Sequence, residues 1–220
     1  MRHQFTAICA LAVLAACGGG GGGGTPPANP TSTPTSTPTA APTQPQYYQP
    51  LASGDSWTYD CHNTQNLSEP HYTIQNTILG TATVAGQSVY EFSMQIPSSP
   101  TQSTTIVELL ANDGQQNTSI YGYLVNGTPA AIAPTVIVAA SPGPKGTAYN
   151  YTAQNGSSID RIFEGVESSN PTQLGTFTVA PYFESGGTHN YGYALGTGIV
   201  EEDHGPNYLY DCLITAATLH

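Results

Sequence analysis

Residues 56–62, SWTYDCH, and residues 207–216, NYLYDCLITA, decide the fold that the sequence predicts. In both stretches bulky apolar or aromatic residues alternate with polar ones, which is the pattern of a β-strand with one buried face. Each cysteine therefore shares a face with the large side chains of its strand. These sets are Trp57, Tyr59 and Cys61, and Tyr208, Tyr210, Cys212 and Ile214. We expect both cysteines on the core side of the first and last strands.

The rest of residues 47–220 continues this pattern. Short runs rich in Tyr, Thr, Val and Ile are separated by turn residues, and no window has a convincing apolar period of 3.6. We predict a single all-β domain: an antiparallel twisted sheet or open barrel, with a two-sheet sandwich as the alternative. The expected strands are residues 56–62, 71–81, 87–96, 103–111, 117–125, 134–140, 147–154, 158–168, 173–184, 189–195, 197–202 and 207–216.

A sparse internal repeat adds the hypothesis of two similar β-meander halves. The sequence GDSWTY at residues 54–59 recurs as GTAYNY at residues 146–151, in the form Gly-x-x-aromatic-x-Tyr. Hairpin turns are expected at Asp113-Gly114, Asn126-Gly127 and Asn155-Gly156, because these pairs suit the positive φ angles of tight hairpins.

The charge of the chain excludes nucleic acid as a partner. The 220 residues contain three Lys and Arg against 14 Asp and Glu, for a formal net charge of −11. A chain with so few basic residues has no electrostatic footprint for nucleic acid. We expect no nucleic-acid partner and no cofactor.

Residues 1–16 resemble a bacterial lipoprotein signal peptide. Arg2 precedes an apolar run that is too short to cross a hydrocarbon core, and LAACG at residues 14–18 resembles a lipobox. The resemblance implies that Cys17 is lipidated and begins the mature chain, so that the lipid makes the membrane a partner. Residues 17–46 then form a Gly-rich and Pro/Thr-rich disordered linker. By analogy with lipoprotein sorting, Gly18 favours the outer membrane.

The two cysteines of the β-domain are expected to form a disulfide. An exported chain is oxidised, and Cys61 and Cys212 remain once the signal peptide and the lipidated Cys17 are set aside. This bridge would join the first strand to the last.

The start of the domain resembles a family. Residues 48–59, YQPLASGDSWTY, are similar to the Y-x-P-L-x-x-G-x-x-W-x-Y opening of a group of uncharacterised bacterial lipoproteins. LGTF at residues 174–177 and GTGIVEE at residues 196–202 resemble later marks of the same group. The resemblance implies a β-rich lipoprotein domain and no particular activity, and the cysteine pair is not part of its pattern.

Three groups of residues could carry chemistry. Gly54-Asp55-Ser56 resembles the first block of GDSL-type hydrolases, but a turn that enters a strand explains it better because no matching Asp-x-x-His follows. Glu201 and Asp203 are weak candidates for a hard cation such as Ca²⁺, and a solvated acidic turn is the alternative. The histidines are dispersed and offer no metal-ligand spacing.

Tyrosines that alternate along strands form the remaining candidate site. A face of aromatic residues could be cross-strand core packing or the wall of a groove for an apolar or glycan ligand. The possible ligand face consists of Trp57, Tyr59, Tyr121, Tyr123, Tyr149, Tyr151, Tyr191 and Tyr193.

These observations lead to three functional hypotheses. The first is a lipid-anchored cell-envelope protein whose β-domain binds or scaffolds a partner without catalysis. The second is a carrier of an apolar or lipid ligand in a Tyr-lined groove, and the third is a hydrolase. An apolar pocket of several hundred Å³ would favour the carrier, and a filled core with a flat aromatic patch would favour the scaffold.

Overall fold

A computed structural model describes residues 46–99, 101–186, 189–205 and 209–220. The signal peptide, Cys17 and the linker up to residue 45 lie outside the described residues, as does Tyr208. Every regular element in the described ranges is a β-strand, so the predicted all-β class is confirmed. These ranges contain no helix with the length and apolar character of a membrane span.

The first half of the domain is an antiparallel meander in which each strand pairs with the next. Its strands are β1 (Ser56–Asn63), β2 (Tyr72–Val84), β3 (Gln87–Ser99), β4 (Gln102–Asn112), β5 (Thr118–Val125) and β6 (Thr128–Val138).

The second half is a meander of the same kind, with one short extra strand. Its strands are β7 (Ala148–Thr152), β8 (Ser158–Phe163), β9 (Glu167–Ser168), β10 (Thr178–Glu184), β11 (His189–Ala194), β12 (Gly198–His204) and β13 (Tyr210–Thr218). The main path runs β7-β8-β10-β11-β12-β13, and β9 pairs with β10 beside it.

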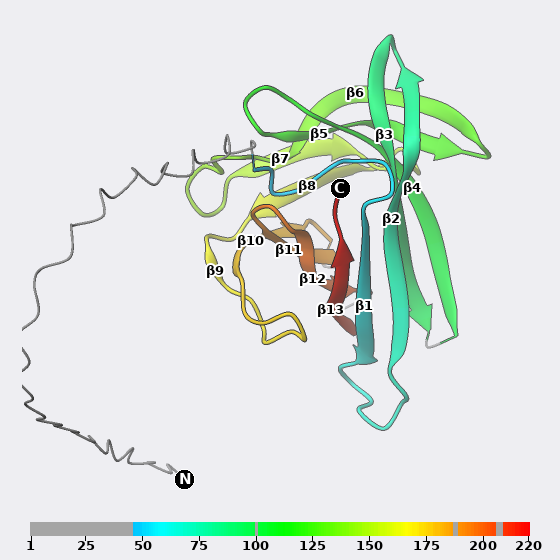
Figure 1. The fold of residues 1–220 in the computed structure, drawn as a ribbon. Coiled ribbons are helices and arrows are strands. Elements are labelled where there is room, and N and C mark those ends of the chain that lie inside the picture. Colours follow the sequence, from blue (N-terminus) through cyan, green and yellow to red (C-terminus); the bar gives the residue numbers. More distant parts are fainter. Residues whose placement is uncertain (1–45, 100, 187–188, 206–208) are drawn as a thin grey trace, which may run out of the picture. The chain divides into compact units, whose positions relative to one another are not determined.

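One strand pair joins the two halves into a single sheet. β1 pairs with β13, so the sheet order is β6-β5-β4-β3-β2-β1-β13-β12-β11-β10-β8-β7. The sheet curls until its end strands β6 and β7 approach each other, which makes it a nearly closed barrel (Figure 1). The open-barrel prediction is confirmed, and the alternative of a two-sheet sandwich is wrong because one continuous sheet passes through both halves.

The predicted disulfide lies at this junction. Cys61 and Cys212 are register partners on β1 and β13, and their sulfur atoms are bonded at 2.09 Å. Every second residue of β1 is buried, beginning with Trp57, as the alternation of the sequence predicts. Cys61 and Cys212 are both fully buried, so they lie on the core side.

The turn that precedes each half repeats the same hydrogen bonds. The amide of Gly54 donates to the carbonyl of Ile78 in β2 at 2.9 Å, and the amide of Gly146 donates to that of Phe163 in β8 at 2.8 Å. The φ angles of the two glycines are +92° and +91°, a region that favours glycine. The two halves thus share strand order and starting geometry, as the sequence repeat predicts.

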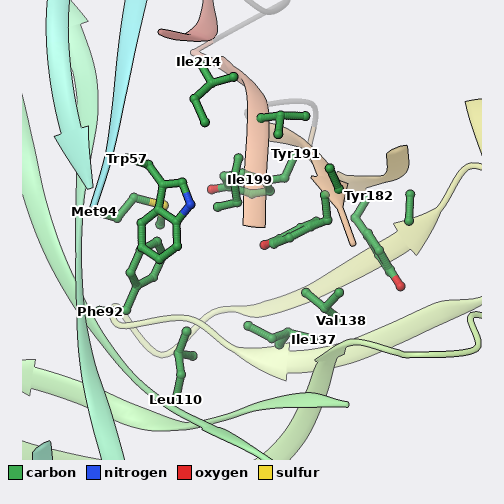
Figure 2. Packing of buried hydrophobic residues seen from close by; sticks show 14 of the residues in the cluster. Trp57, Phe92, Met94, Leu110, Ile137, Val138, Tyr182, Tyr191, Ile199 and Ile214 are labelled. Carbon is green, nitrogen blue, oxygen red and sulfur yellow. The ribbon is translucent and has the colours of Figure 1, made fainter. Parts of the chain in front are cut away.

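Side chains from both halves fill the inside of the barrel. Trp57 and Phe92 pack edge to face at 5.8 Å between ring centroids. Figure 2 shows these two rings and Met94 facing Tyr191 and Ile199 across the interior. Each half therefore covers the apolar face of the other.

The three largest differences between predicted and observed strand limits lie in β6, β8 and β10. β6 begins at Thr128 rather than residue 134, because the Asn126-Gly127 turn returns the chain directly into the sheet with φ angles of +50° and +76°. The strand expected over 158–168 ends at Phe163, before Gly165 with φ +101°. The strand expected over 173–184 begins at Thr178, after a turn at Thr172–Gly175.

Candidate functional site

A cavity of about 280 Å³, open to solvent, lies between β3, β4 and β5 on one side and β7, β8, β10 and β11 on the other. The turn between β7 and β8 contributes Gln154 and Asn155, which are exposed, so this turn forms the rim. The lining has an aliphatic part, Met94, Ile96, Ile106 and Ile159; an aromatic part, Tyr123, Tyr151 and Tyr191; and an ionisable part, Glu108, Glu184 and His189.

Strand alternation explains how charged residues reach the interior. In β4, Ile106, Glu108 and Leu110 are spaced by two, so the carboxyl group points to the same side as its apolar neighbours. In β8, Arg161 is likewise two residues from Ile159 and from Phe163, so its side chain points to the same side as these apolar residues. Glu108 is 6% exposed and Arg161 is 1% exposed.

Arg161 and Glu184 form a buried ion pair beside the cavity. The Arg161 Nη2 donates to Glu184 Oε1 at 2.6 Å, and Nη1 donates to the hydroxyl of Tyr193 at 3.2 Å. The guanidinium also lies over the rings of Tyr151 and Tyr191, at 5.3 and 4.8 Å from their centroids. A buried guanidinium needs such partners because its desolvation is costly.

Both oxygens of Glu184 are engaged. Oε1 also accepts a hydrogen bond from the Tyr151 hydroxyl at 2.6 Å, and Oε2 lies 3.1 Å from His189 Nδ1. Burial by itself raises the pKa of Glu184, but the charge of Arg161 and the hydrogen bonds from His189, Tyr151 and Arg161 outweigh burial and lower that pKa to about 2. Glu184 is therefore ionised and fully partnered.

Glu108 differs from Glu184 in that its pKa is raised and its carboxyl group has no hydrogen-bond donor from the described residues. Burial raises the pKa of Glu108 to about 7; the charge of Arg161 opposes this rise and that of Glu184 adds to it. No residue in the described ranges donates a hydrogen bond to the Glu108 carboxyl, which lines the cavity. The two carboxyl groups of this cavity thus differ in pKa: burial dominates at Glu108, whereas the partners of Glu184 outweigh its burial.

A second polar chain lies deeper in the barrel. Asn76 Nδ2 donates to Glu202 Oε1 at 2.5 Å, and Glu202 Oε2 lies 2.7 Å from His204 Nε2. Glu202 and His204 are almost completely buried, and His204 Nδ1 has no hydrogen-bond partner among the described atoms. The His204 ring packs against His189 at 5.3 Å, which connects this chain to the cavity wall.

The structure divides the predicted aromatic face. Tyr123, Tyr151 and Tyr191 line the cavity. Trp57, Tyr59, Tyr149 and Tyr193 belong to the surrounding core: for example, the Tyr59 hydroxyl donates to the carbonyl of Ile199 at 3.0 Å.

The expectation that Tyr121 and Tyr123 share a face is wrong. The register of β4 with β5 shifts between Leu109 and Leu110, and Tyr121 has no register partner there. This β-bulge turns Tyr121 to the other side of the sheet, where it packs against a small cluster that contains Leu109.

Glu201 and Asp203 lie on the face of β12 opposite Glu202 and His204. Glu201 Oε2 accepts from the amide of Asn170 at 3.0 Å, and Asp203 Oδ2 accepts from Asn190 Nδ2 at 3.2 Å. Burial and the nearby Asp211 raise the pKa of Asp203 to about 6. In the part of the chain that the structure describes, no cluster of three or more His, Cys, Asp or Glu could hold a metal ion.

The GDSL-like residues Asp55 and Ser56 have a structural role. Asp55 is buried; its Oδ2 accepts from the amide of Ala52 at 2.9 Å and its Oδ1 from the amide of His220 at 2.8 Å. Asp55 therefore holds the C-terminal residue against the first turn, and Ser56 begins β1, as the turn-and-strand interpretation predicts.

The sequence interpretation missed the ionisable residues of the cavity. Glu108, Arg161 and Glu184 were not among the candidates, although their spacing of two from buried apolar residues was visible in the chain. His189 is one of the dispersed histidines of the sequence, and the pairing of β10 with β11 brings it to Glu184.

Comparisons with known proteins give matches to solved structures alone. No family model and no curated protein matches the chain. A protein from Bacteroides fragilis, described as exported and of YmcC-like fold, is 13% identical with a TM-score of 0.46; the match covers 79% of this chain and 99% of that one. A protein from Parabacteroides distasonis, described as a lipoprotein, is 12% identical with a TM-score of 0.38, and the match covers 80% of this chain and 100% of that one.

Proposed function

We propose that this protein is a lipid-anchored protein of the bacterial cell envelope that binds a small, largely apolar ligand inside its β-barrel, without catalysis. The observation that carries the proposal is the cavity of about 280 Å³, whose lining includes Met94, three isoleucines and three tyrosines. Pockets for drug-sized ligands span roughly 300–1,000 Å³, so this cavity suits a smaller molecule.

The location of the cavity supports a binding role over a scaffolding role. A scaffold would present a flat apolar patch on the outside, whereas the aromatic residues that the sequence singled out face inward, with the exception of Tyr121. The lipobox-like sequence that ends at Cys17 supports the membrane anchor, and the linker up to residue 46 would hold the barrel away from the bilayer.

Calorimetric titration with 1-hexanol tests this proposal. The mature chain, residues 17–220, carries Cys17→Ser so that it needs no detergent, and we expect saturable binding. Ile106→Trp fills the cavity and should abolish that binding. Val107→Trp is the matched control, because Val107 is the next residue of β4 and points to the opposite face. Equal binding to both variants, or no binding to the parent chain, would contradict the proposal.

A further inference from the structure

We propose that the cavity selects a small organic cation, a protonated amine with an apolar body, and that Glu108 is its counter-ion. This inference rests on the proposed function and names the chemical class of the ligand.

The Glu108 side chain is buried and has no hydrogen-bond donor from the described protein. It is 6% exposed, it lines the cavity, and within the described ranges no residue donates a hydrogen bond to it. A carboxyl group buried without a donor is costly unless something outside the protein supplies one. A ligand with N–H donors in the cavity supplies them.

The other carboxyl group of the wall, Glu184, and two of the wall's tyrosine hydroxyls are engaged within the protein. The Tyr151 hydroxyl donates to Glu184, and Glu184 also accepts from Arg161 and contacts His189. The Tyr123 hydroxyl of β5 donates to the carbonyl of Thr152 in β7 at 3.2 Å. Of the two carboxyl groups in the wall, Glu108 is therefore the one that remains to orient the polar end of a ligand.

The charges around the cavity favour a cationic ligand over an anionic one. The basic residues of the described chain are Lys145 and Arg161. Lys145 pairs with Glu164 and is 71% exposed, and Arg161 is buried against Glu184. A carboxylate or phosphate in the cavity would therefore meet two glutamates and no free lysine or arginine.

The aromatic wall favours the same sign. The faces of tyrosine rings attract cations, and Tyr123 and Tyr151 line the cavity together with Glu108. The ring of Tyr151 already lies beside one cation in this structure, the guanidinium of Arg161. The remaining aliphatic lining, such as Ile96 and Ile106, suits an alkyl chain attached to the amine.

Three probes of equal length and different charge test the inference. Hexylammonium, 1-hexanol and hexanoate are titrated into the mature chain with Cys17→Ser at pH 8, where Glu108 is ionised. We expect hexylammonium to bind at least tenfold more tightly than 1-hexanol, and hexanoate to bind more weakly than both. Glu108→Gln should remove the tenfold advantage of hexylammonium and leave 1-hexanol binding within about twofold.

Glu91→Gln is the matched control, since Glu91 precedes Phe92 on β3 and points away from the interior. It should preserve the order of the three probes. The comparison of the three probes on the chain with Glu108 intact does not depend on whether Glu108→Gln folds.

The outcomes separate this inference from the proposed function. Binding of 1-hexanol as tight as that of hexylammonium, or a preference for hexanoate, overturns the cation inference and leaves the binding cavity standing. No binding of any of the three probes overturns both. Retention of the hexylammonium advantage in a folded Glu108→Gln variant also overturns the inference.

Discussion

Arg161 organises the polar interior of the barrel. It is held by the Glu184 carboxylate and the Tyr193 hydroxyl, and it lies over the rings of Tyr151 and Tyr191. A buried ion pair adds little net stability when compared with an apolar pair of the same volume, but removal of one partner leaves an uncompensated charge. If Arg161 were removed, the charge left without a partner would be that of Glu184, which is 5% exposed.

Arg161→Met is expected to lower the free energy of unfolding by about 3–5 kcal/mol, because Glu184 would keep a buried charge without a cation. Urea denaturation followed by tryptophan fluorescence measures this change. Lys145→Met is the control: its ion pair with Glu164 is exposed, so its loss should cost at most about 1 kcal/mol. Similar losses for the two variants would show that the Arg161 pair is not a buried, coupled pair.

The raised pKa of Glu108 makes the stability of the folded protein depend on pH. Its pKa is about 7 in the folded protein and 4.5 in its ordinary state, so between these pH values the folded state binds more protons than the unfolded state. The free energy of unfolding therefore falls as the pH rises through this window. The charged groups that act electrostatically on Glu108 include Arg161, Glu184, His189 and Glu202, and the tyrosines coupled to it are Tyr123, Tyr151, Tyr191 and Tyr193.

Glu108→Gln should remove this fall. Relative to the parent chain, the variant should gain about 3 kcal/mol between pH 4.5 and pH 8. Urea midpoints across this range measure the difference, and Glu91→Gln serves as the reference on the outer face. A constant offset between the Glu108→Gln and parent curves would contradict the raised pKa. Glu184 does not interfere, because its contribution is lost below pH 4.5 as the pH falls towards its own pKa of about 2.

At the scale of single elements, the strands follow simple alternation until a bulge interrupts it. β5 alternates correctly up to Ile120, and the bulge at Tyr121 then reverses the faces of the remainder. The turn at Asn126-Gly127 was predictable because both residues adopt positive φ. The expected two-residue turn at Asp113-Gly114 is instead a longer loop, in which the Asp113 side chain accepts from the amides of Gln115 and Asn117.

Gly198, the first residue of β12, can be used to test how closely this strand must approach Trp57. Gly198 has φ +95°, and a Cβ there would lie 2.9 Å from Nε1 of the fully buried Trp57. Gly198→Ala should therefore lower the free energy of unfolding by about 1–3 kcal/mol, through backbone strain and displacement of the indole. Thermal unfolding by circular dichroism measures the change.

Gly114→Ala is the matched control, because a Cβ at Gly114 meets no atom within 4 Å. It should change the stability by less than about 0.5 kcal/mol. If the two glycine variants were equally stable, the close approach of β12 to Trp57 would not matter for the fold.

At the scale of the whole molecule, the two meanders depend on each other. Trp57 and Tyr59 of β1 donate hydrogen bonds to the carbonyls of Thr197 and Ile199, which belong to the other half. The disulfide between Cys61 and Cys212 fixes the same junction across a sequence separation of 151 residues. Loss of the junction would separate two open sheets, each with an exposed apolar face.

The double variant Cys61→Ala/Cys212→Ala is expected to lose about 2–5 kcal/mol of unfolding free energy, because the long loop becomes unconstrained in the unfolded state. Reductant should lower the urea midpoint of the parent chain to that of the variant and leave the variant unchanged. A reductant effect of the same size on both proteins would contradict this origin of the stability.

The all-β class, the core side of β1 and β13, the disulfide and the starting turn of each half could all be predicted from the amino-acid sequence. Each depends on local alternation, on glycine geometry or on cysteine arithmetic, all of which can be read along the chain. The approach of β6 to β7, and the gathering of Glu108, Glu184 and His189 around one cavity, became visible in the folded structure alone. The physical reason is that strand order and bulges, which depend on contacts between distant residues, determine which side chains meet inside a closed sheet.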